Sequence, residues 1–356
     1  MSVINGMILG APMKRPTVTD LANAAGLSVS TVNRLLHGTG ALRPDTVERI
    51  LNAAQSIGFY GLGILRERKQ TNLPRRRLGF LLQQSHRAIN RLWADSIVAA
   101  ASRRVDTLIE PVIEFEDDLS PEAVAGHLLA LGEACDAVAV VTADHPLISQ
   151  AIDELRARDT PVIAYITDLS AASRAAFVGT DNWKAGRTAA WFISQMARRP
   201  GKVFPFVGSH RYQCQDISDA SFRSYMRERA PAFVVHETQL TNEEPQIAYE
   251  IVRRLIAEEP DLVGIFVAGG GISGVLRAMR AFDAPRRQDI KIVCRDIGPE
   301  AQKGLAEGLI TAAVPHSLKR MPEELIEVML DRIEGRGQTS IQQRIVPFDI
   351  VTPESA

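Results

Sequence analysis

The sequence predicts an α/β protein in which a small all-helical module precedes two doubly wound lobes built on parallel sheets. Three observations support this fold class. Residues 17–58 carry apolar side chains at three- and four-residue spacing, the period of helices. After residue 77, short β-rich apolar runs alternate with amphipathic stretches, as in sheets covered by helices on both faces. Roughly ten such runs are too many for one ordinary sheet, which favours two lobes.

The helical module begins with clear local signals. Thr17 and Asp20 form a capping box that predicts the start of a first helix, and Gly26 supplies a left-handed end. Ser28 can cap a second helix and Pro44 suits the first turn of a third. This spacing is typical of a helix-turn-helix motif. We expect these apolar residues to face its core: Leu21, Ala24, Ala25, Val32, Leu35, Val47, Ile50, Leu51, Ala54 and Ile57.

Residues 59–77, FYGLGILRERKQTNLPRRR, separate the helical module of residues 14–58, called the headpiece below, from the lobes of residues 78–350. This linker combines glycines, a short potential helix and a basic run, a composition that indicates a flexible connection between domains.

The lobes are predicted from apolar runs of four to seven residues, each short enough to be a buried strand. In chain order the runs are LGFLL, PVIEF, AVAVV, PVIAYI, AAFVGT, VFPFVG, FVVHE, LVGIFVA, IKIVC and TAAVP. With roughly ten strands, two lobes and a cleft between them are expected.

Charge is unevenly distributed along the 356-residue chain. Its formal net charge is −1, yet residues 14–77 hold 11 lysines and arginines against 4 acidic residues. A basic amino-terminal module on an acidic body predicts a polyanionic partner for one part of the protein, with nucleic acid as the leading candidate.

The cysteines and the amino terminus argue against a secreted, metal-binding or membrane protein. Cys135, Cys214 and Cys294 show neither a disulfide framework nor zinc-ligand spacing, so we expect reduced thiols, no metal and no cofactor. The start, MSVINGMILGAP, has no basic region before a short apolar stretch, which argues against a signal peptide or membrane span. We therefore expect a cytoplasmic protein without membrane contact, with translation starting at Met1 or Met13.

The segment PTVTDLANAAGLSVSTVNRLLHG, followed by RPDTVERILNAAQSIGF, resembles the headpiece of the lactose-repressor (LacI/GalR) family of bacterial transcription regulators. The resemblance continues more weakly through TDNWKAGRTAAWFI, SFRSYMRE, LVGIFVAGG and ITAAV, and so covers nearly all of residues 16–350. It implies lobes of periplasmic-binding-protein type and a homodimer on a palindromic operator. It also implies a sugar or sugar derivative as effector, and repression of a carbohydrate uptake or catabolism operon that the effector relieves. The sequence itself does not distinguish induction from corepression.

In such a motif the second helix lies in the major groove, where its exposed early residues meet base edges. We expect Arg34 to bind guanine, Ser30 to donate or accept a hydrogen bond with a base, and Val29 to pack on a thymine methyl group. Asn33 completes this exposed set. Contacts to phosphates are expected from Thr17, Thr31, His37 and Arg43.

The linker departs from the pattern of the family. Relatives usually have Pro-Asn after the aromatic residue and a hinge helix whose leucine enters the minor groove. Here Gly61-Leu62-Gly63 stands at that entry, and Arg68 occupies the usual leucine position. We favour Leu65 as the inserted residue, one turn earlier, with electrostatic entry of Arg68 as the alternative. A basic tether that folds only on DNA is a third reading.

Effector residues are expected just after the apolar runs, because ligands of doubly wound lobes bind beyond the carboxyl ends of strands. Carboxylates, amides and guanidinium groups together suit sugar hydroxyls. Asp296 is the strongest candidate, since it matches a carboxylate with which the family binds effectors, and its alternative role is to cap the next helix. The other candidates after these runs are Gln83, Ser85, His86, Asn90, Asp168, His210 and Arg211. His316 is expected to approach the ligand from the last crossover between the lobes, and its alternative role is structural.

Two positions depart from the usual ligand set of the family. Ser218 stands where an arginine is usual, and Gly269 stands where an asparagine is usual. Arg211 or His210 is expected to replace the missing arginine. Trp183 is expected either to stack on a sugar face or to fill the seam between the lobes, and Asp181 to cap the following helix. For both, the structural role is favoured.

Parts of the sequence also fit two other classes of protein. Gly269, Gly271 and Gly274 form a GxGxxG pattern with Asp296 about twenty residues on, which resembles a dinucleotide site of an NAD-dependent oxidoreductase. The late position of these glycines and the absence of a catalytic partner domain disfavour that reading. The missing signal sequence and the headpiece disfavour a secreted solute-binding protein. No other catalytic pattern stands out, so no catalytic residue is assigned and we do not expect an enzyme.

Overall fold

The structure is a computed structural model that describes residues 15–39, 42–65, 73–335 and 340–356. The chain divides into two compact units. The first contains the headpiece and extends to Arg75, with Arg104–Leu108 added, and the second contains both lobes. Within these described ranges, no helix has the length and apolar character needed to cross a membrane.

The headpiece consists of α1 (Val18–Ala25), α2 (Val29–His37) and α3 (Pro44–Ser56). Both hydrogen bonds of the predicted capping box at Thr17 are present. Gly26 ends α1 in the left-handed conformation, with φ 62°. The predicted three-helix motif is therefore confirmed, together with its first cap and its glycine turn.

The core of the headpiece differs from the predicted one in a few positions. Ala24 is exposed, and Ala22 is buried in its place. Arg49 of α3 explains part of the packing, because its Nη2 atom donates to the carbonyl oxygen of Ala25 at 2.8 Å and so holds the end of α1 against α3. The buried set is Leu21, Ala22, Ala25, Val32, Leu35, Val47, Ile50, Ala53, Ala54, Phe59 and Leu65.

The first lobe is built on a six-stranded sheet in the order β12-β5-β4-β3-β1-β2. The pairs β1–β3, β3–β4, β4–β5 and β5–β12 are parallel. The strand bounds are β1 (Arg75–Gln83), β2 (Leu108–Glu116), β3 (Ala137–Val140), β4 (Val162–Tyr165), β5 (Ala176–Thr180) and β12 (Gln342–Val346).

The second lobe has the sheet order β11-β10-β9-β6-β7, with β8 also paired to β6, and its strand pairs are parallel. The strand bounds are β6 (Lys202–Val207), β7 (Val234–Val235), β8 (Gln239–Leu240), β9 (Leu262–Val267), β10 (Lys291–Cys294) and β11 (Ala312–Ala313).

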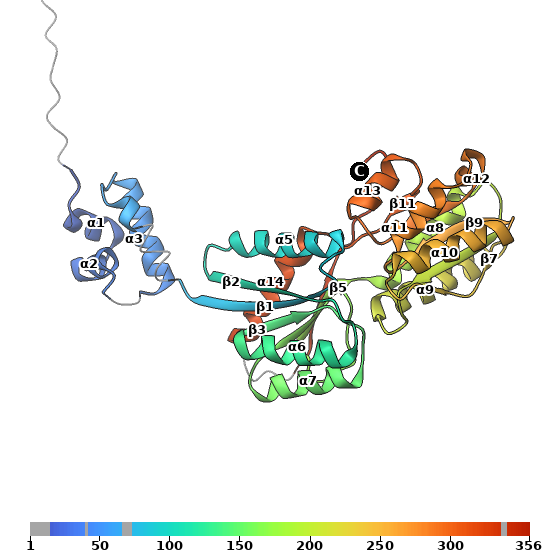
Figure 1. Ribbon diagram of the computed structural model, residues 1–356. Helices are drawn as coiled ribbons and strands as arrows, with labels where there is room; N and C mark the ends of the chain where they lie inside the picture. The colour runs from blue at the N-terminus through green and yellow to red at the C-terminus, as the bar shows by residue number, and fades with distance from the viewer. Residues whose placement is uncertain (1–14, 40–41, 66–72, 336–339) are drawn as a thin grey trace, which may run out of the picture. The chain divides into compact units, whose positions relative to one another are not determined.

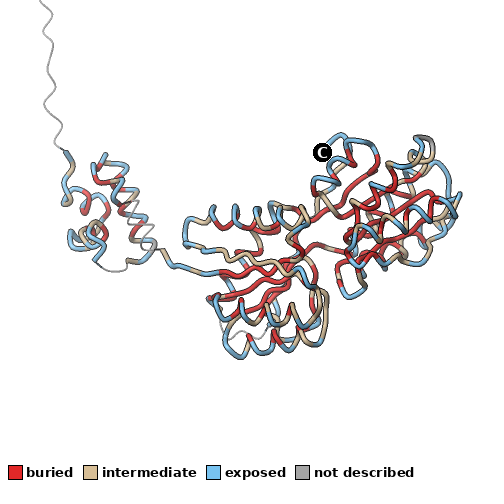
Figure 2. The backbone as a smooth tube through the Cα atoms, in the orientation of Figure 1, coloured by how far each residue is buried: buried red, intermediate tan, exposed pale blue. Residues whose placement is uncertain are grey.

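Helices cover both faces of each sheet, which confirms the doubly wound α/β architecture (Figure 1). The strands run through the buried interior while the outer helix faces are exposed (Figure 2). In the first lobe, α5 (Ala88–Ser102) and α14 (Arg320–Glu334) pack on one face, and α6 (Pro121–Ala134) and α7 (Pro146–Ala157) on the other. In the second lobe, one face of the sheet carries α10 (Pro245–Glu258), α11 (Ile272–Arg280) and α13 (Pro299–Ala306). The other face carries α8 (Asn182–Met196) and α9 (Gln213–Arg229). A short helix, α12 (Ala284–Asp289), precedes β10.

The chain passes between the lobes more than once. It leaves the first lobe after β5 and returns to it between β11 and α14. Helix α14 then packs against α5 in the first lobe. At these two crossings, Thr180 Oγ1 and His316 Nδ1 lie 3.1 Å apart. These two connections therefore contact each other at the junction between the lobes.

Candidate functional site

The second headpiece helix, α2, presents two chemically different faces. Val32 and Leu35 are fully buried in the core of the headpiece. Val29 is 39% exposed, and Ser30 and Arg34 also face solvent. The predicted base-reading residues therefore share an accessible surface, and the two buried residues hold the helix at a fixed angle for contact with a groove.

The hydroxyl groups at the start of α2 are already organised by its cap. The Ser28 side chain accepts a hydrogen bond from the amide of Thr31 at 3.2 Å. Its oxygen also lies 2.9 Å from Ser30 Oγ and 2.8 Å from Thr31 Oγ1. Both hydroxyls are thus held at the positive end of the helix, where backbone amides favour an anion such as a phosphate.

The remaining candidates for DNA contact lie around this helix. Thr17 is exposed and its hydroxyl donates to Asp20 at 2.7 Å. His37 is exposed in the last turn of α2, and Asn33 is partly buried. Arg43 is exposed at the start of α3 and makes no capping bond with its side chain.

The linker residue Leu65 is not placed as the inserted residue that we expected. Its side chain is fully buried in the headpiece core beside Phe59. The reason is that the chain turns helical from Leu62, with the Leu65 amide bonded to the carbonyl of Gly61 at 3.0 Å, which brings Leu65 back onto the core. The alternative position, Arg68, lies outside the described residues.

A cavity of about 130 Å³ lies between the two lobes. The predicted residues Gln83, Asn90, Asp296 and His316 line it together. The side-chain nitrogen Nδ2 of Asn90 donates to the backbone carbonyl of Gln83 at 2.6 Å. The side-chain oxygen Oδ1 of Asn90 is therefore the atom that can accept a hydrogen bond from a ligand. The structure thus gathers four residues that the sequence scatters over more than two hundred positions.

Two other predicted ligand residues have partners outside this cavity. Ser85 donates through its amide to Asp117 at 2.7 Å and through its hydroxyl at 3.1 Å. Asp168 forms a largely buried ion pair with Arg174 at 2.7 Å. Both arrangements satisfy the polar groups within the first lobe.

Three more predicted residues lie outside the 130 Å³ cavity. His86 lines a neighbouring space of about 290 Å³, which Asp296 also lines. His210 is exposed and its Nδ1 lies 2.8 Å from Asp216 Oδ1. Arg211 lines a larger cavity, of about 410 Å³. None of the three is among the residues that line the 130 Å³ cavity.

Asp181 and Trp183, for which a structural role was favoured, both lie at the start of α8. Asp181 caps α8 by accepting from the amide of Lys184 at 2.9 Å, as predicted. Trp183 is 48% exposed and does not line the interlobe cavity.

Asp296 combines the two roles that the sequence left open. Its Oδ1 accepts from the amide of Gly298 at 2.5 Å, at the start of α13. The same side chain lines the interlobe cavity. Burial raises the pKa of Asp296 above its ordinary value, so this carboxyl group pays a desolvation cost that hydrogen bonds from ligand hydroxyls would offset.

Arg295, which was not predicted as a site residue, also lines the cavity and is 8% exposed. Its Nη1 donates to Asn182 Oδ1 at 2.6 Å and to Ser218 Oγ at 3.0 Å. Its Nη2 donates to Thr180 Oγ1 at 2.7 Å and lies 3.2 Å from His316 Nε2. A guanidinium group therefore lies beside Ser218, although neither Arg211 nor His210 supplies it. The signal was present, because Arg295 directly follows a predicted strand.

Burial controls the protonation of this cluster. It lowers the pKa of Arg295 to about 10, and burial together with the Arg295 charge holds the pKa of His316 well below its ordinary value. His316 is therefore neutral near pH 7. If Nε2 accepts from Arg295, the proton lies on Nδ1 and is donated to Thr180.

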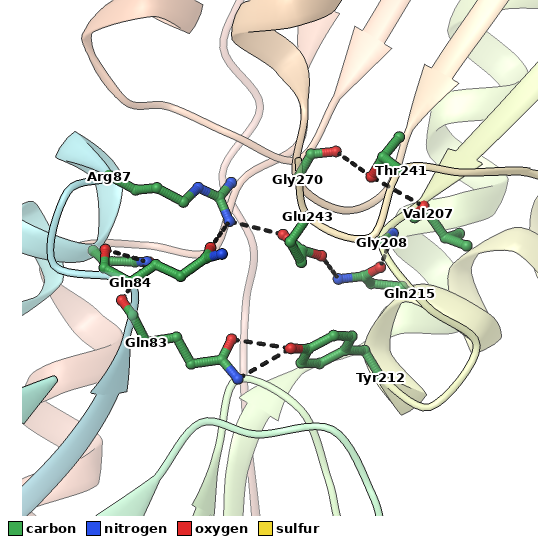
Figure 3. Close-up of polar contacts among 11 residues, drawn as sticks. Gln83, Gln84, Arg87, Val207, Gly208, Tyr212, Gln215, Thr241, Glu243 and Gly270 are labelled. Atoms are coloured by element: carbon green, nitrogen blue, oxygen red, sulfur yellow. Dashed lines mark hydrogen bonds and ion pairs between the residues drawn. The ribbon is translucent and has the colours of Figure 1, made fainter. Parts of the chain in front are cut away.

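Several polar contacts join the lobes across the cleft, and Figure 3 draws two of the pairs. Arg87 Nη1 donates to Glu243 Oε2 at 2.8 Å, and both side chains are largely buried. Gln83 Nε2 lies 3.0 Å from the hydroxyl of Tyr212. Tyr212 and Glu243 line both the 130 Å³ and the 410 Å³ cavities, so these pairs stand between the two spaces.

Glu243 is held in place by a shaped surface of the second lobe. Its backbone has φ 62°, an uncommon value for a residue with a side chain. Its Oε1 accepts from Gln215 at 2.8 Å. A Cβ atom on Gly208 or Gly270 would collide with its carboxylate. These glycines therefore allow the close approach of the carboxylate to the backbone that Figure 3 shows.

Packing accounts for the glycines of the GxGxxG pattern. Gly271 has φ 104°, which favours glycine at the start of α11. A Cβ atom on Gly274 would collide with the carbonyl of Pro245, where α11 packs on α10. A Cβ atom on Gly269 would collide with the side chain of Gln215 in the cleft. The spacing thus follows from helix packing and close contacts, which weakens the dinucleotide reading.

Family models match two parts of the chain. Residues 17–61 match the model described as bacterial regulatory proteins, lacI family, and residues 121–337 match the periplasmic binding protein domain. Over 57 residues the chain is 35% identical to the maltose regulon regulatory protein MalI of Vibrio furnissii. That match spans 16% of this chain and 38% of the length of the relative.

Solved structures show the same two-lobed fold. A periplasmic solute-binding protein of an ABC transporter from Actinobacillus succinogenes 130z, with bound D-allose, has a TM-score of 0.70 at 18% identity, covering 79% of this chain and 98% of that one. A solute-binding protein from Burkholderia graminis C4D1M, in complex with D-arabinose, also has a TM-score of 0.70, at 17% identity, covering 78% and 96%. At such identities the likeness concerns the fold alone.

Proposed function

Because this chain belongs to the lacI family of bacterial regulatory proteins and carries a periplasmic binding protein domain, we propose that it is a sugar-responsive transcription regulator. In this proposal the headpiece binds a palindromic operator, and a small sugar-like effector binds between the lobes. We further propose that it represses a carbohydrate uptake or catabolism operon in the cytoplasm and that the effector releases it.

The observation that carries the DNA-binding role is the two-faced α2. Buried Val32 and Leu35 anchor the helix, while Val29, Ser30 and Arg34 are exposed on the face that would meet base edges in the major groove. The basic charge of residues 14–77 supports contact with phosphates. A homodimer would present two such helices to the two halves of a palindrome.

The interlobe cavity supports an effector of modest size. Its volume of about 130 Å³ is well below the ~300–1,000 Å³ of pockets for drug-sized ligands, which favours a molecule no larger than a monosaccharide derivative. Asp296 and Asn90 offer acceptors for hydroxyl groups. The fold relatives that bind D-allose and D-arabinose support the same class of ligand.

Coupling between effector and DNA follows from the crossings between the lobes. Arg295 lines the cavity and bonds to Thr180 and His316, which lie on two of the connections. A ligand that contacts this cluster would change the relative stability of open and closed lobes. Only such differential binding can alter operator affinity.

The experiment that tests the function starts from full-length protein and a random DNA pool. Selection should enrich a palindromic site, and fluorescence anisotropy should then show binding that weakens steeply with salt. Adding the effector identified in a thermal-shift screen of sugars and sugar acids should release the site. Enrichment of no sequence would contradict the DNA-binding role. Ligand binding that leaves operator affinity unchanged would favour a solute-binding protein, and tighter operator binding would make the ligand a corepressor.

A further inference from the structure

Arg295 carries a positive charge that no negative group of the described chain balances. Four hydrogen bonds join its two Nη atoms to neutral partners, an amide oxygen, two hydroxyls and an imidazole. Its Nε is buried and has no hydrogen-bond partner among the residues that the structure describes. No ion pair of Arg295 with a carboxylate occurs among the described residues.

A buried cation without a counter-ion is costly, because neutral dipoles replace only part of the lost hydration. Arg87, the other arginine that lines the cavity, shows the usual solution, since Glu243 neutralises it at 2.8 Å. Arg174 and Arg223 likewise pair with Asp168 and Asp219. Among these arginines of the lobes, Arg295 alone relies on uncharged partners, and it lines a cavity.

The neighbouring carboxyl group of Asp296 does not fill this role. Its Oδ1 is bonded to the amide of Gly298, and the charges that act on its pKa are those of Arg87 and Glu243 rather than Arg295. The cavity therefore has a cationic group, Arg295, and a separate hydroxyl acceptor, Asp296. A ligand complementary to both carries a negative charge and hydroxyl groups.

We propose that the effector is a small polyol with one carboxylate, such as an aldonate or a uronate, whose charge is balanced by Arg295. This inference rests on the proposed function, because it names the class of ligand for the same cavity. A carboxylate fits better than a phosphate monoester. One unpaired arginine matches a single negative charge, whereas a phosphate brings about −1.5 to −2 at pH 7.

The test compares ligands that differ only in the carboxylate. Isothermal titration of the full-length protein would use D-glucuronate against D-glucose, D-galacturonate against D-galactose, and D-gluconate against D-glucitol, with glucose 6-phosphate as the phosphate arm. At least one acid is expected to bind at least about tenfold more tightly than its neutral partner.

Variants then assign the preference to Arg295. Arg295→Gln should remove the tenfold preference for the acid, and Arg295→Lys, which keeps the charge, should retain part of it. The matched control is Arg199→Gln, because Arg199 is exposed in the second lobe and pairs with Asp261. Should Arg295→Gln fail to fold, the comparison of ligands on the wild type and on Arg295→Lys still decides the question.

The outcomes separate this inference from the proposed function. Binding of neutral sugars without a preference for their acids would overturn the carboxylate and leave a sugar-responsive regulator. Binding of glucose 6-phosphate alone would also overturn it, in favour of a phosphate. Binding of none of these compounds would reject both the carboxylate and the sugar-like effector. An acid preference that persists in Arg295→Gln would remove Arg295 from the site.

Discussion

Arg87 of the first lobe and Glu243 of the second are joined at 2.8 Å across the cleft, with 16% and 8% of their side chains exposed. Arg87 stands at the amino-terminal cap of α5, where the helix dipole disfavours a cation, so the carboxylate offsets that cost as well. Glu243 adopts a left-handed backbone that few non-glycine residues use. This ion pair is therefore a specific tie between the lobes.

Arg87→Met should shift the lobes toward an open arrangement. The Glu243 carboxylate would keep only its bond from Gln215, and leaving it buried without a cation would cost about 3–5 kcal/mol. Opening the cleft hydrates the carboxylate and avoids most of this cost. Spin labels at Asp153→Cys on α7 and Ala257→Cys on α10 would measure the distance between the lobes, since the three native cysteines are buried.

The matched control is Arg91→Met in the first turn of α5, because Arg91 is exposed and its side chain donates to the carbonyl of Ser85 in its own lobe. It should leave the distance between the labels unchanged. An unchanged distance in Arg87→Met as well would show that the pair does not hold the lobes.

Arg34→Ala should weaken discrimination between operator sequences more than it weakens binding as such. The loss of one bidentate contact to guanine is expected to cost ~1–3 kcal/mol of discrimination. Anisotropy titrations with the selected operator and with a site in which that guanine is replaced would measure it. Arg43→Ala, at an exposed position with no capping bond, is the comparison, and it should lower affinity for every sequence alike. Equal weakening of all DNA by Arg34→Ala would disprove the base-reading role.

Gly274→Ala should destabilise the second lobe if the glycine is needed for packing rather than for a dinucleotide. The added methyl group would meet the Pro245 carbonyl, and overpacking of this kind costs about 1–3 kcal/mol. Chemical denaturation would measure the loss. In contrast, Gly126→Ala in α6, where nothing lies within 4 Å of the new methyl group, should raise the free energy of unfolding by about 0.5–1 kcal/mol. Equal effects of the two substitutions would contradict the packing role.

Much of the fold is readable from the sequence because its cause is local. Strands such as β3 and β9 are fully buried, so each appears as a continuous apolar run. β8 and β12 were not predicted. β8 has only two residues, and β12 reads Gln-Gln-Arg-Ile-Val with alternating exposure at the edge of its sheet. Their positions depend on neighbouring strands rather than on their own composition.

The site was less predictable, because it depends on contacts between distant residues. Asp296 was predicted from its place after a strand and His316 from its place at the last crossover, and both line the cavity. Asp168 also follows a strand, yet its carboxylate forms an ion pair with Arg174 inside the first lobe. Leu65 was expected to be exposed for insertion into the minor groove, but the helical turn after Gly61 buries it in the core of the headpiece. No local pattern distinguishes a cavity residue from one that a neighbour already satisfies.

His127 should make the stability of the first lobe depend on pH. Its Nδ1 lies 3.0 Å from Glu116 and its Nε2 contacts Glu114, both on β2. Partial burial lowers the pKa of His127, but these carboxylates raise it more, so it lies above the ordinary 6.5. A raised pKa means that the stabilisation is complete below 6.5 and is lost as the pH rises through the folded-state value. The difference in free energy of unfolding between wild type and His127→Gln should therefore shrink from about pH 6 to pH 9 in urea titrations. In a Glu114→Gln, Glu116→Gln background this decline with pH should disappear, because only the burial that lowers the pKa remains. With both glutamates present, a difference that grows with pH would contradict the assignment.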